Sequence, residues 1–200
     1  MQSSSRAPVL PPARSCSALD ALRSQTTPPA AITLVMCGDA ASARESGAIA
    51  GAVEGIIQAR GGTSFADAVE LARPRILEGS AVWLLAHDTA PHERALERLV
   101  GTLERSPSAA IVAPKLVHTD NEREIVSLGV SMTTLGRAVE LAAGELDQGQ
   151  HDGSDDALGA DIRGMLIRGE VRDALRPDPA LAGADLGLDL GVRALSLIHI

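Results

Sequence analysis

The chain has 200 residues, 45% of them hydrophobic, and a formal net charge of −8 at pH 7, which suits one domain with an apolar core. Its basic residues form no run and do not alternate with aromatic residues, so the composition argues against a nucleic-acid partner. No apolar run approaches the roughly 20 residues that span a bilayer. Cys16 and Cys37 have no metal-site spacing and make no disulfide framework, which favours a reducing compartment.

The first part of the chain alternates between strand and helix patterns. Residues 1–16 are rich in Ser and Pro and are expected to be loose, so the domain is predicted over 17–194. The order and spacing predict an α/β fold with a right-handed, mostly parallel sheet and helices on both faces. In chain order the pattern predicts a helix over 17–25, a buried strand over 31–37, helices over 44–59 and 65–77, a strand over 81–86, a helix over 92–105 and a strand over 109–112.

After Pro114 the strand–helix rhythm changes. Two short apolar segments separated by a turn predict a hairpin-like excursion, and an acidic, Gly-rich stretch predicts a flexible loop. A last strand and two helices are expected after it. The ranges are 124–131 and 137–141 for the hairpin, 144–156 for the loop, 160–167 for the strand, 169–175 for a short helix and 186–194 for the start of the final helix.

The stretch 81–91 carries the strongest functional signal. Aliphatic residues and the chain's only Trp, at position 83, give way abruptly to His87 and Asp88, and Pro91 precedes the next helix. Ligands of open α/β sheets bind beyond the carboxyl ends of the strands. Asp88 is therefore the leading candidate for a site residue. The alternative interpretation is a carboxylate favoured by the dipole of the following helix, with Thr89 as its cap.

Three stretches together resemble a known family. The stretch 83–91 is similar to an aliphatic strand followed by Asp-x-Asp and Pro, with Asp88 on the second Asp and Ala86 on the first. The stretch 164–168 reads Gly-Met-Leu-Ile-Arg, and 178–194 is similar to a late acidic block that ends in Asp-Leu-x-x-Arg. In this order they resemble the inverting family-2 glycosyltransferases of the GT-A fold. The resemblance covers about residues 17–194 and implies a GT-A (Rossmann-like) fold, incomplete at both ends.

The resemblance implies a role for each candidate residue near the donor. Asp88 would bind a divalent metal, Mg²⁺ or Mn²⁺, on the diphosphate of a nucleoside-diphosphate-sugar donor. His87 would lie beside it, and Asp39 near the nucleoside. The alternatives are a satisfied strand-end histidine for His87 and a turn former for Asp39.

The catalytic base comes from the late acidic block in this family, which makes Asp185 and Asp189 the candidates. Asp185 can equally cap a helix, and Asp189 can form a helical salt bridge with Arg193. When the block is registered on Asp189, Leu186 and Gly187 occupy the family's base positions.

Three functions are open at this stage. The first is transfer of a sugar, with inversion, to a polysaccharide or glycolipid acceptor in cell-envelope biogenesis. The expected location is the cytoplasm or the cytoplasmic face of the membrane, with a membrane-associated parent protein. The second is a catalytically inactive GT-A-like scaffold or nucleotide-sugar-binding domain. The third, an unrelated Rossmann-like enzyme, lacks a Gly-x-Gly-x-x-Gly after a strand. Residues 195–200 resemble a translated sequencing adapter, so a truncated fragment with a non-native tail is expected.

Overall fold

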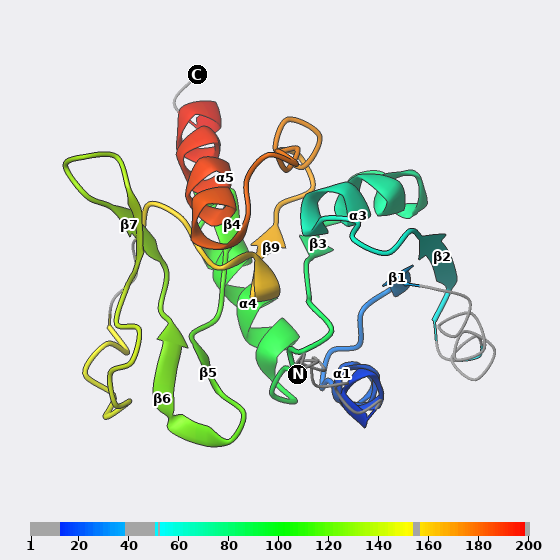
Figure 1. The fold of residues 1–200 in the computed structure, drawn as a ribbon, viewed down its shortest axis with the longest axis horizontal. Helices are drawn as coiled ribbons and strands as arrows, with labels where there is room; N and C mark the ends of the chain where they lie inside the picture. The colour runs from blue at the N-terminus through cyan, green and yellow to red at the C-terminus, as the bar shows by residue number, and fades with distance from the viewer. Residues whose placement is uncertain (1–12, 39–50, 52, 154–156, 199–200) are drawn as a thin grey trace, which may run out of the picture.

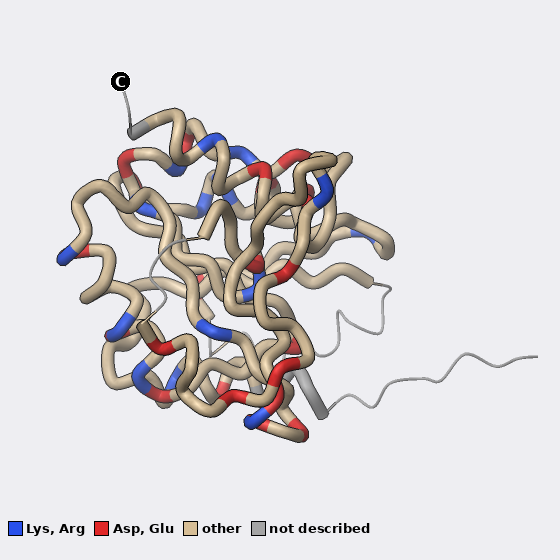
Figure 2. Tube along the Cα trace, turned by 90° about the vertical axis from the view of Figure 1, so that its left-hand side faces the viewer, with Lys and Arg blue, Asp and Glu red and all other residues tan. Residues whose placement is uncertain are grey.

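The computed structural model describes residues 13–38, 51, 53–153 and 157–198, and its elements are labelled in Figure 1. In chain order these are α1 (Ala13–Arg23), β1 (Thr33–Cys37), β2 (Gly55–Ala59), α3 (Phe65–Ala72), the 3₁₀ turn η1 (Arg73–Arg75), β3 (Val82–Trp83), α4 (Ala95–Arg105), β4 (Ile111–Val112), β5 (Leu116–His118), β6 (Asn121–Ser127), β7 (Val130–Met132), β8 (Ala138–Glu140), the 3₁₀ turn η2 (Ile162–Gly164), β9 (Leu166–Ile167) and α5 (Gly183–Ile198). Acidic and basic positions are interspersed along the trace (Figure 2).

The centre of the fold is a three-stranded sheet in the order β3-β9-β4. Leu166 of β9 packs with the buried leucines of α4 and with Trp83. Its neighbours Met165 and Ile167 pack in the other cluster, which holds residues of α3 and α5. Successive side chains of a strand point to opposite faces, so β9 supplies both cores at once. The expectation of helices on both faces holds for this sheet.

The sheets are mixed, so the predicted mostly parallel sheet is not confirmed. β1 and β2 do pair in parallel, with Thr33 opposite Gly55 and Cys37 opposite Ala59. β9, however, lies between β3 and β4 and runs antiparallel to both. The strand predicted over 160–167 contributes only its last two residues and returns against the direction of its neighbours.

Two predicted helices are wrong where the structure describes them. The end of the helix expected over 44–59 is strand β2, whose β-branched Ile56 and Ile57 pair with β1; residues 44–50 and 52 lie outside the described residues. The helix expected over 169–175 is a series of turns, because its backbone bonds alternate between three- and four-residue spacing. By contrast, the helix expected over 65–77 is present as α3, which Ser64 caps, and Pro74 stands in the 3₁₀ turn that follows it.

The segment after β4 forms two antiparallel pairs, β5-β6 and β7-β8, at the left of Figure 1. The β7-β8 pair confirms the predicted hairpin in part, because the strand expected over 124–131 is divided: residues 124–127 belong to β6, which pairs with β5. The described part of the next stretch, up to residue 153, consists mainly of turns, as expected for a loop, and carries ion pairs. Lys115 Nζ binds the carboxylates of Asp147 (2.6 Å) and Asp152 (2.9 Å), and His151 lies 2.9 Å from Glu145.

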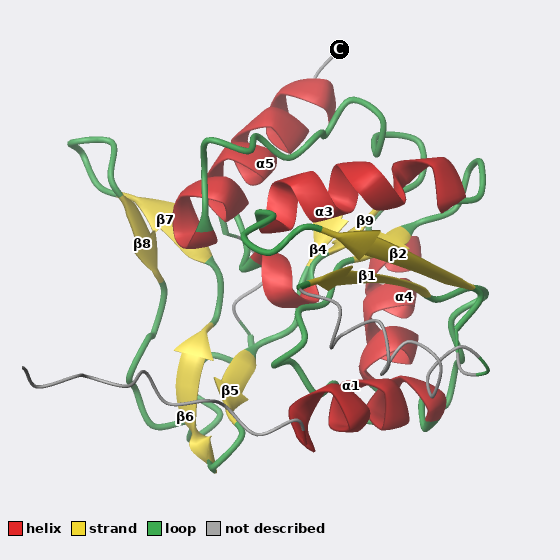
Figure 3. Ribbon diagram, turned by 45° about the vertical axis from the view of Figure 1, so that its right-hand side comes forward, coloured by secondary structure: helices red, strands yellow, loops and turns green. Residues whose placement is uncertain are grey.

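Helix α4 is capped at its start by a side chain from another part of the chain. Arg94 stands at the N-cap position but makes no side-chain cap bond. Instead, Gln25, which is 6% exposed, accepts the N–H of Leu96 (3.0 Å) and donates to the carbonyl oxygen of His92 (2.8 Å). These bonds fix the segment after α1 against the start of α4, below the β1-β2 pair in Figure 3.

The other end of α4 is capped by Arg168. Its guanidinium donates to the carbonyl oxygens of Leu103 (2.6 Å), Ser106 (3.0 Å) and Ala109 (2.8 Å). A cation at a helix C-terminus satisfies free carbonyl groups and complements the helix dipole. Arg168 therefore joins β9 to the segment that connects α4 with β4.

Helix α5 packs directly on the backbone of residues 158–160. A Cβ atom added at Gly187 would overlap the carbonyl oxygen of Ala160, and one added at Gly191 would overlap that of Leu158. From the other side, a Cβ at Gly159 would lie 2.5 Å from the carbonyl oxygen of Gly187. The helix and this segment thus approach each other at a distance that only glycine permits.

Candidate functional site

The chain that leaves β3 ends in a tight turn at the edge of a pocket. Thr89 N–H donates to the carbonyl oxygen of Ala86 (3.1 Å), so Asp88 lies inside the turn and is exposed. The pocket has a volume of about 340 Å³. Its lining comes from five parts of the chain: Phe65 of α3; Ala86, His87 and Asp88 after β3; Glu140 of β8; Asp161, Ile162 and Arg163 at η2; and Gly183 at the start of α5.

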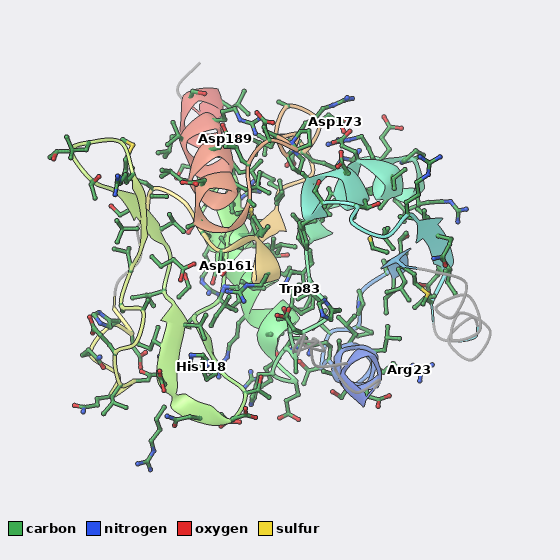
Figure 4. The ribbon with its side chains drawn as sticks, viewed as in Figure 1. Arg23, Trp83, His118, Asp161, Asp173 and Asp189 are labelled. Atoms are coloured by element: carbon green, nitrogen blue, oxygen red, sulfur yellow. The ribbon has the colours of Figure 1, made fainter. Side chains whose placement is uncertain are left out.

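Asp161 and Arg163 form a rigid ion pair on one side of this pocket. Arg163 Nη2 lies 2.6 Å from Asp161 Oδ2, and Nε donates to both carboxylate oxygens, at 3.0 and 3.1 Å. Asp161 also accepts the backbone N–H of Arg163 (2.8 Å) and so caps η2. Trp83 Nε1 donates to the carbonyl oxygen of Gly164 (3.1 Å), which fixes the turn against β3. Figure 4 shows Asp161 and Trp83 in this central region.

The pocket is electrostatically mixed, with three carboxylates around one guanidinium. The hydrogen bonds that Arg163 donates to Asp161 raise the pKa of Arg163 above its usual value, and the charges of Asp161, Asp88 and Glu140 raise it further. Arg163 therefore stays charged, but Asp161 pairs with it, and the three carboxylates leave the pocket lining with more negative than positive charge. The three side-chain bonds of Arg163 to Asp161 fix its orientation, so the guanidinium is held in the same pocket as the exposed Asp88.

Asp161, Arg163 and Glu140 are pocket residues that the sequence interpretation did not identify. Asp161 and Arg163 stand immediately before the Gly164 stretch that carries the family resemblance, so their position was a usable signal. Glu140 had no such signal, because it lies in a hairpin strand with no motif around it. Only the pairing of β8 with β7 brings it to the pocket.

The predicted site residues are only partly brought together. Asp88 and His87 both line the pocket. Asp39 lies outside the described residues. Asp185 is exposed in the first turn of α5, and neither it nor Asp189 lines the pocket.

Asp189 is engaged in a helical ion pair. Its carboxylate accepts Nε of Arg193 at 3.0 Å, and the same arginine donates Nη2 to the carbonyl oxygen of Arg176 (2.7 Å). This is the salt bridge that was considered as the alternative for Asp189. Figure 4 shows Asp189 on α5, above Asp161 in the view.

A second hollow of about 520 Å³ lies at the carboxyl end of β2. Gln58, Ala59 and Arg60 form one side, and Thr63 and three residues of α3 form the other. Both hollows thus lie where a strand ends, the location at which α/β sheets bind ligands.

The donor set at Asp88 limits which metal can bind there. Within the part of the chain that the structure describes, no group of three or more His, Cys, Asp or Glu side chains is placed to hold a metal ion. Asp88 can still supply one oxygen. This fits a Mg²⁺-like cation that takes most of its ligands from phosphate and water, and it does not fit a metal held by protein alone.

Comparison with known proteins gives one match. A family model described as Glycosyltransferase like family 2 matches residues 18–198, almost the whole chain. No curated protein and no solved structure matches. Among the helices that the structure describes, none has both the length and the apolar character needed to cross a membrane. The chain belongs to the glycosyltransferase family 2-like proteins.

Proposed function

We propose that this glycosyltransferase domain transfers a sugar, with inversion, from a nucleoside-diphosphate-sugar donor to a polysaccharide or glycolipid acceptor. The observation that carries the proposal is the pocket in which Asp88, at the end of β3, lies with the Asp161–Arg163 pair. A diphosphate leaving group needs positive charge beside it; Arg163 supplies one guanidinium, already paired with Asp161, and a divalent cation would supply the rest. Membership of the family supports the same general reaction. A role in cell-envelope biogenesis, on the cytoplasmic side of the membrane, belongs to this proposal.

Asp88 is proposed to hold the donor through a divalent cation, Mg²⁺ or Mn²⁺. When bound, that cation would neutralise charge on the diphosphate. The exposed carboxylate of Asp88 accepts no hydrogen bond from any residue that the structure describes, so it is available as a ligand. His87 lines the same pocket and would contact the donor. Asp39 remains proposed as a contact to the nucleoside.

A second candidate function is a nucleotide-sugar-binding domain without catalysis. The position of the late acids favours it, because Asp185 is exposed outside the pocket and Asp189 is paired with Arg193. In addition, Leu186 is only 1% exposed, and Gly187 lies against the backbone of Ala160. This candidate predicts donor binding without sugar transfer.

Calorimetric binding of UDP, with and without Mn²⁺, tests the donor site. We expect binding that depends on the metal and is lost in Asp88→Ala. The matched control is Asp120→Ala, because Asp120 is an exposed acid in the turn between β5 and β6 and is not a pocket residue. If the folded wild-type chain does not bind UDP, the proposal is wrong. Equal loss in both variants would remove the assignment of Asp88.

A further inference from the structure

Three carboxylates line the pocket, and two of them accept no hydrogen bond from the described residues and can therefore bind a ligand or a proton. Asp161 is engaged twice over by Arg163, through its guanidinium and its backbone N–H. Asp88 and Glu140 accept no hydrogen bond from any residue in the described ranges. Asp88 is exposed, whereas Glu140 is half-buried on β8. If Asp88 holds the donor diphosphate through a cation, Glu140 is the one carboxylate of the pocket that is left to accept a proton.

Helix α5 cannot place a carboxylate in the pocket from the positions where the family resemblance expects the base. Leu186 is part of the apolar core. Gly187 has no room for a side chain, since even its first carbon would overlap Ala160. The only residue that α5 contributes to the lining is Gly183. The carboxylates that line the pocket therefore come from other elements.

The position of Glu140 is fixed by backbone pairing. Glu140 is opposite Val130 in the β7-β8 ladder. Val130 in turn exchanges two hydrogen bonds with Gly159, at 2.8 and 3.0 Å. Two residues later the same segment reaches Asp161 on the pocket wall. The carboxylate of Glu140 is thus carried by a continuous ladder that also positions the Asp161–Arg163 pair.

We infer that Glu140 is the proton acceptor of the transfer reaction, an inference that rests on the proposed function. The acceptor hydroxyl oxygen forms a bond to the anomeric carbon as the bond from that carbon to the diphosphate oxygen breaks. The nucleoside diphosphate leaves with the electron pair, and the hydroxyl proton moves to the Glu140 carboxylate. General-base catalysis of this kind contributes about 10²–10⁴-fold to a rate.

Glu140→Gln tests the inference because it removes the charge and keeps the shape. The matched control is Glu122→Gln, an exposed glutamate of β6 that is not a pocket residue. The assay measures UDP release from UDP-glucose, UDP-galactose and UDP-N-acetylglucosamine, first with water as acceptor and then with soluble glycans. UDP binding by calorimetry and thermal unfolding are measured on the same samples.

We expect Glu140→Gln to lower kcat by about 10²–10⁴-fold, with unchanged UDP affinity and an unchanged unfolding temperature. The pH profile adds a readout that a structural role would not change. Wild-type turnover should fall at acidic pH as Glu140 takes up a proton, and the variant should lose this limb. Four other titratable or charged groups share the pocket and are the same in both proteins: His87, Asp88, Asp161 and Arg163.

The outcomes separate this inference from the proposed function. If Glu140→Gln turns over donor as fast as Glu122→Gln, Glu140 is not the base and the transferase proposal stands. If the wild type binds UDP but releases it from no donor, the inference is overturned in favour of a binding domain. If the wild type does not bind UDP, the proposed function fails and the inference fails with it.

Discussion

Replacing Gly187 by alanine tests the close approach between α5 and the segment 158–160. On an open helix surface this change gains about 1 kcal/mol, because alanine has the higher helix propensity. Here the new methyl group would overlap the carbonyl oxygen of Ala160 and lie 3.1 Å from its carbonyl carbon. Neither atom can rotate away. Overpacking of this kind costs about 1–3 kcal/mol, and contact with fixed backbone favours the upper end.

The expected net loss for Gly187→Ala is about 2 kcal/mol, which lowers the unfolding temperature by about 4–8 °C for a domain of this size. Gly101→Ala in α4 is the matched control. There the added carbon meets only the mobile end of Arg105, at 3.1 Å, so the propensity gain should survive and the unfolding temperature should rise slightly. Thermal unfolding followed by circular dichroism at 222 nm compares the two variants. An equal rise in both would refute the close approach, and with it the argument that no acid can stand at position 187.

Three further predictions concern stability. Gln25→Ala leaves the N–H of Leu96 without its partner and should lower the free energy of unfolding by about 1–3 kcal/mol, measured by guanidinium titration. Arg168→Met removes three hydrogen bonds to carbonyl groups and should lower the free energy of unfolding by about 3 kcal/mol in the same assay. Arg168→Lys should lose less, because lysine keeps the charge but lacks the planar guanidinium that donates to several carbonyl groups at once. Hydrogen bonds from Arg94 and then Thr26 lower the pKa of Glu97 from 4.5 to about 2, so NMR titration of Glu97 should give a midpoint near 2 that rises in Thr26→Val.

The sign of the pH effect follows from the lowered pKa of Glu97. The stabilisation is fully present above pH 4.5 and is lost as the pH falls from there to about 2. A Glu97 midpoint near 4.5 in the folded protein would contradict the contact between Thr26 and α4. For the two substitutions, Arg23→Ala serves as control, because Arg23 is exposed and its ion pair with Asp20 is long, at 4.0 Å. Losses equal to that of Arg23→Ala would contradict both capping roles.

Local patterns predicted the elements that carry a strong apolar period or a clear boundary signal. The helix that became α4 has leucines at positions 96, 99 and 103, and all three are buried. Asp88 was identified because it follows the strand predicted over 81–86. That strand is shorter, Val82–Trp83, but the structure does place Asp88 in a pocket. Both inferences depended on residues close together in the chain, where the spacing of the residues determines their relative positions.

The errors arose where a local pattern was ambiguous or where the partner was distant. Ile49, Val53, Ile56 and Ile57 satisfy a helical period, but the last two belong to a strand that pairs with β1. Short apolar runs fit either period, and here tertiary pairing decides the outcome. The antiparallel β9 was missed for a different reason. Its position between β3 and β4 depends on pairing between residues more than fifty positions apart. The spacing of apolar residues within one segment carries no information about such pairing.

The glycines of α5 leave no room for a carboxylate at position 187, and they also affect where Glu140 lies. Because Gly187 and Gly191 have no side chains, α5 lies directly on the backbone of residues 158–160. That segment exchanges hydrogen bonds with Val130, and Val130 is opposite Glu140. An aspartate at position 187 would push the segment away from α5 and move the ladder that carries Glu140. A carboxylate at position 187 and the observed placement of Glu140 are therefore mutually exclusive in this fold. Gly187 lets α5 lie against the segment that aligns the hairpin carrying Glu140.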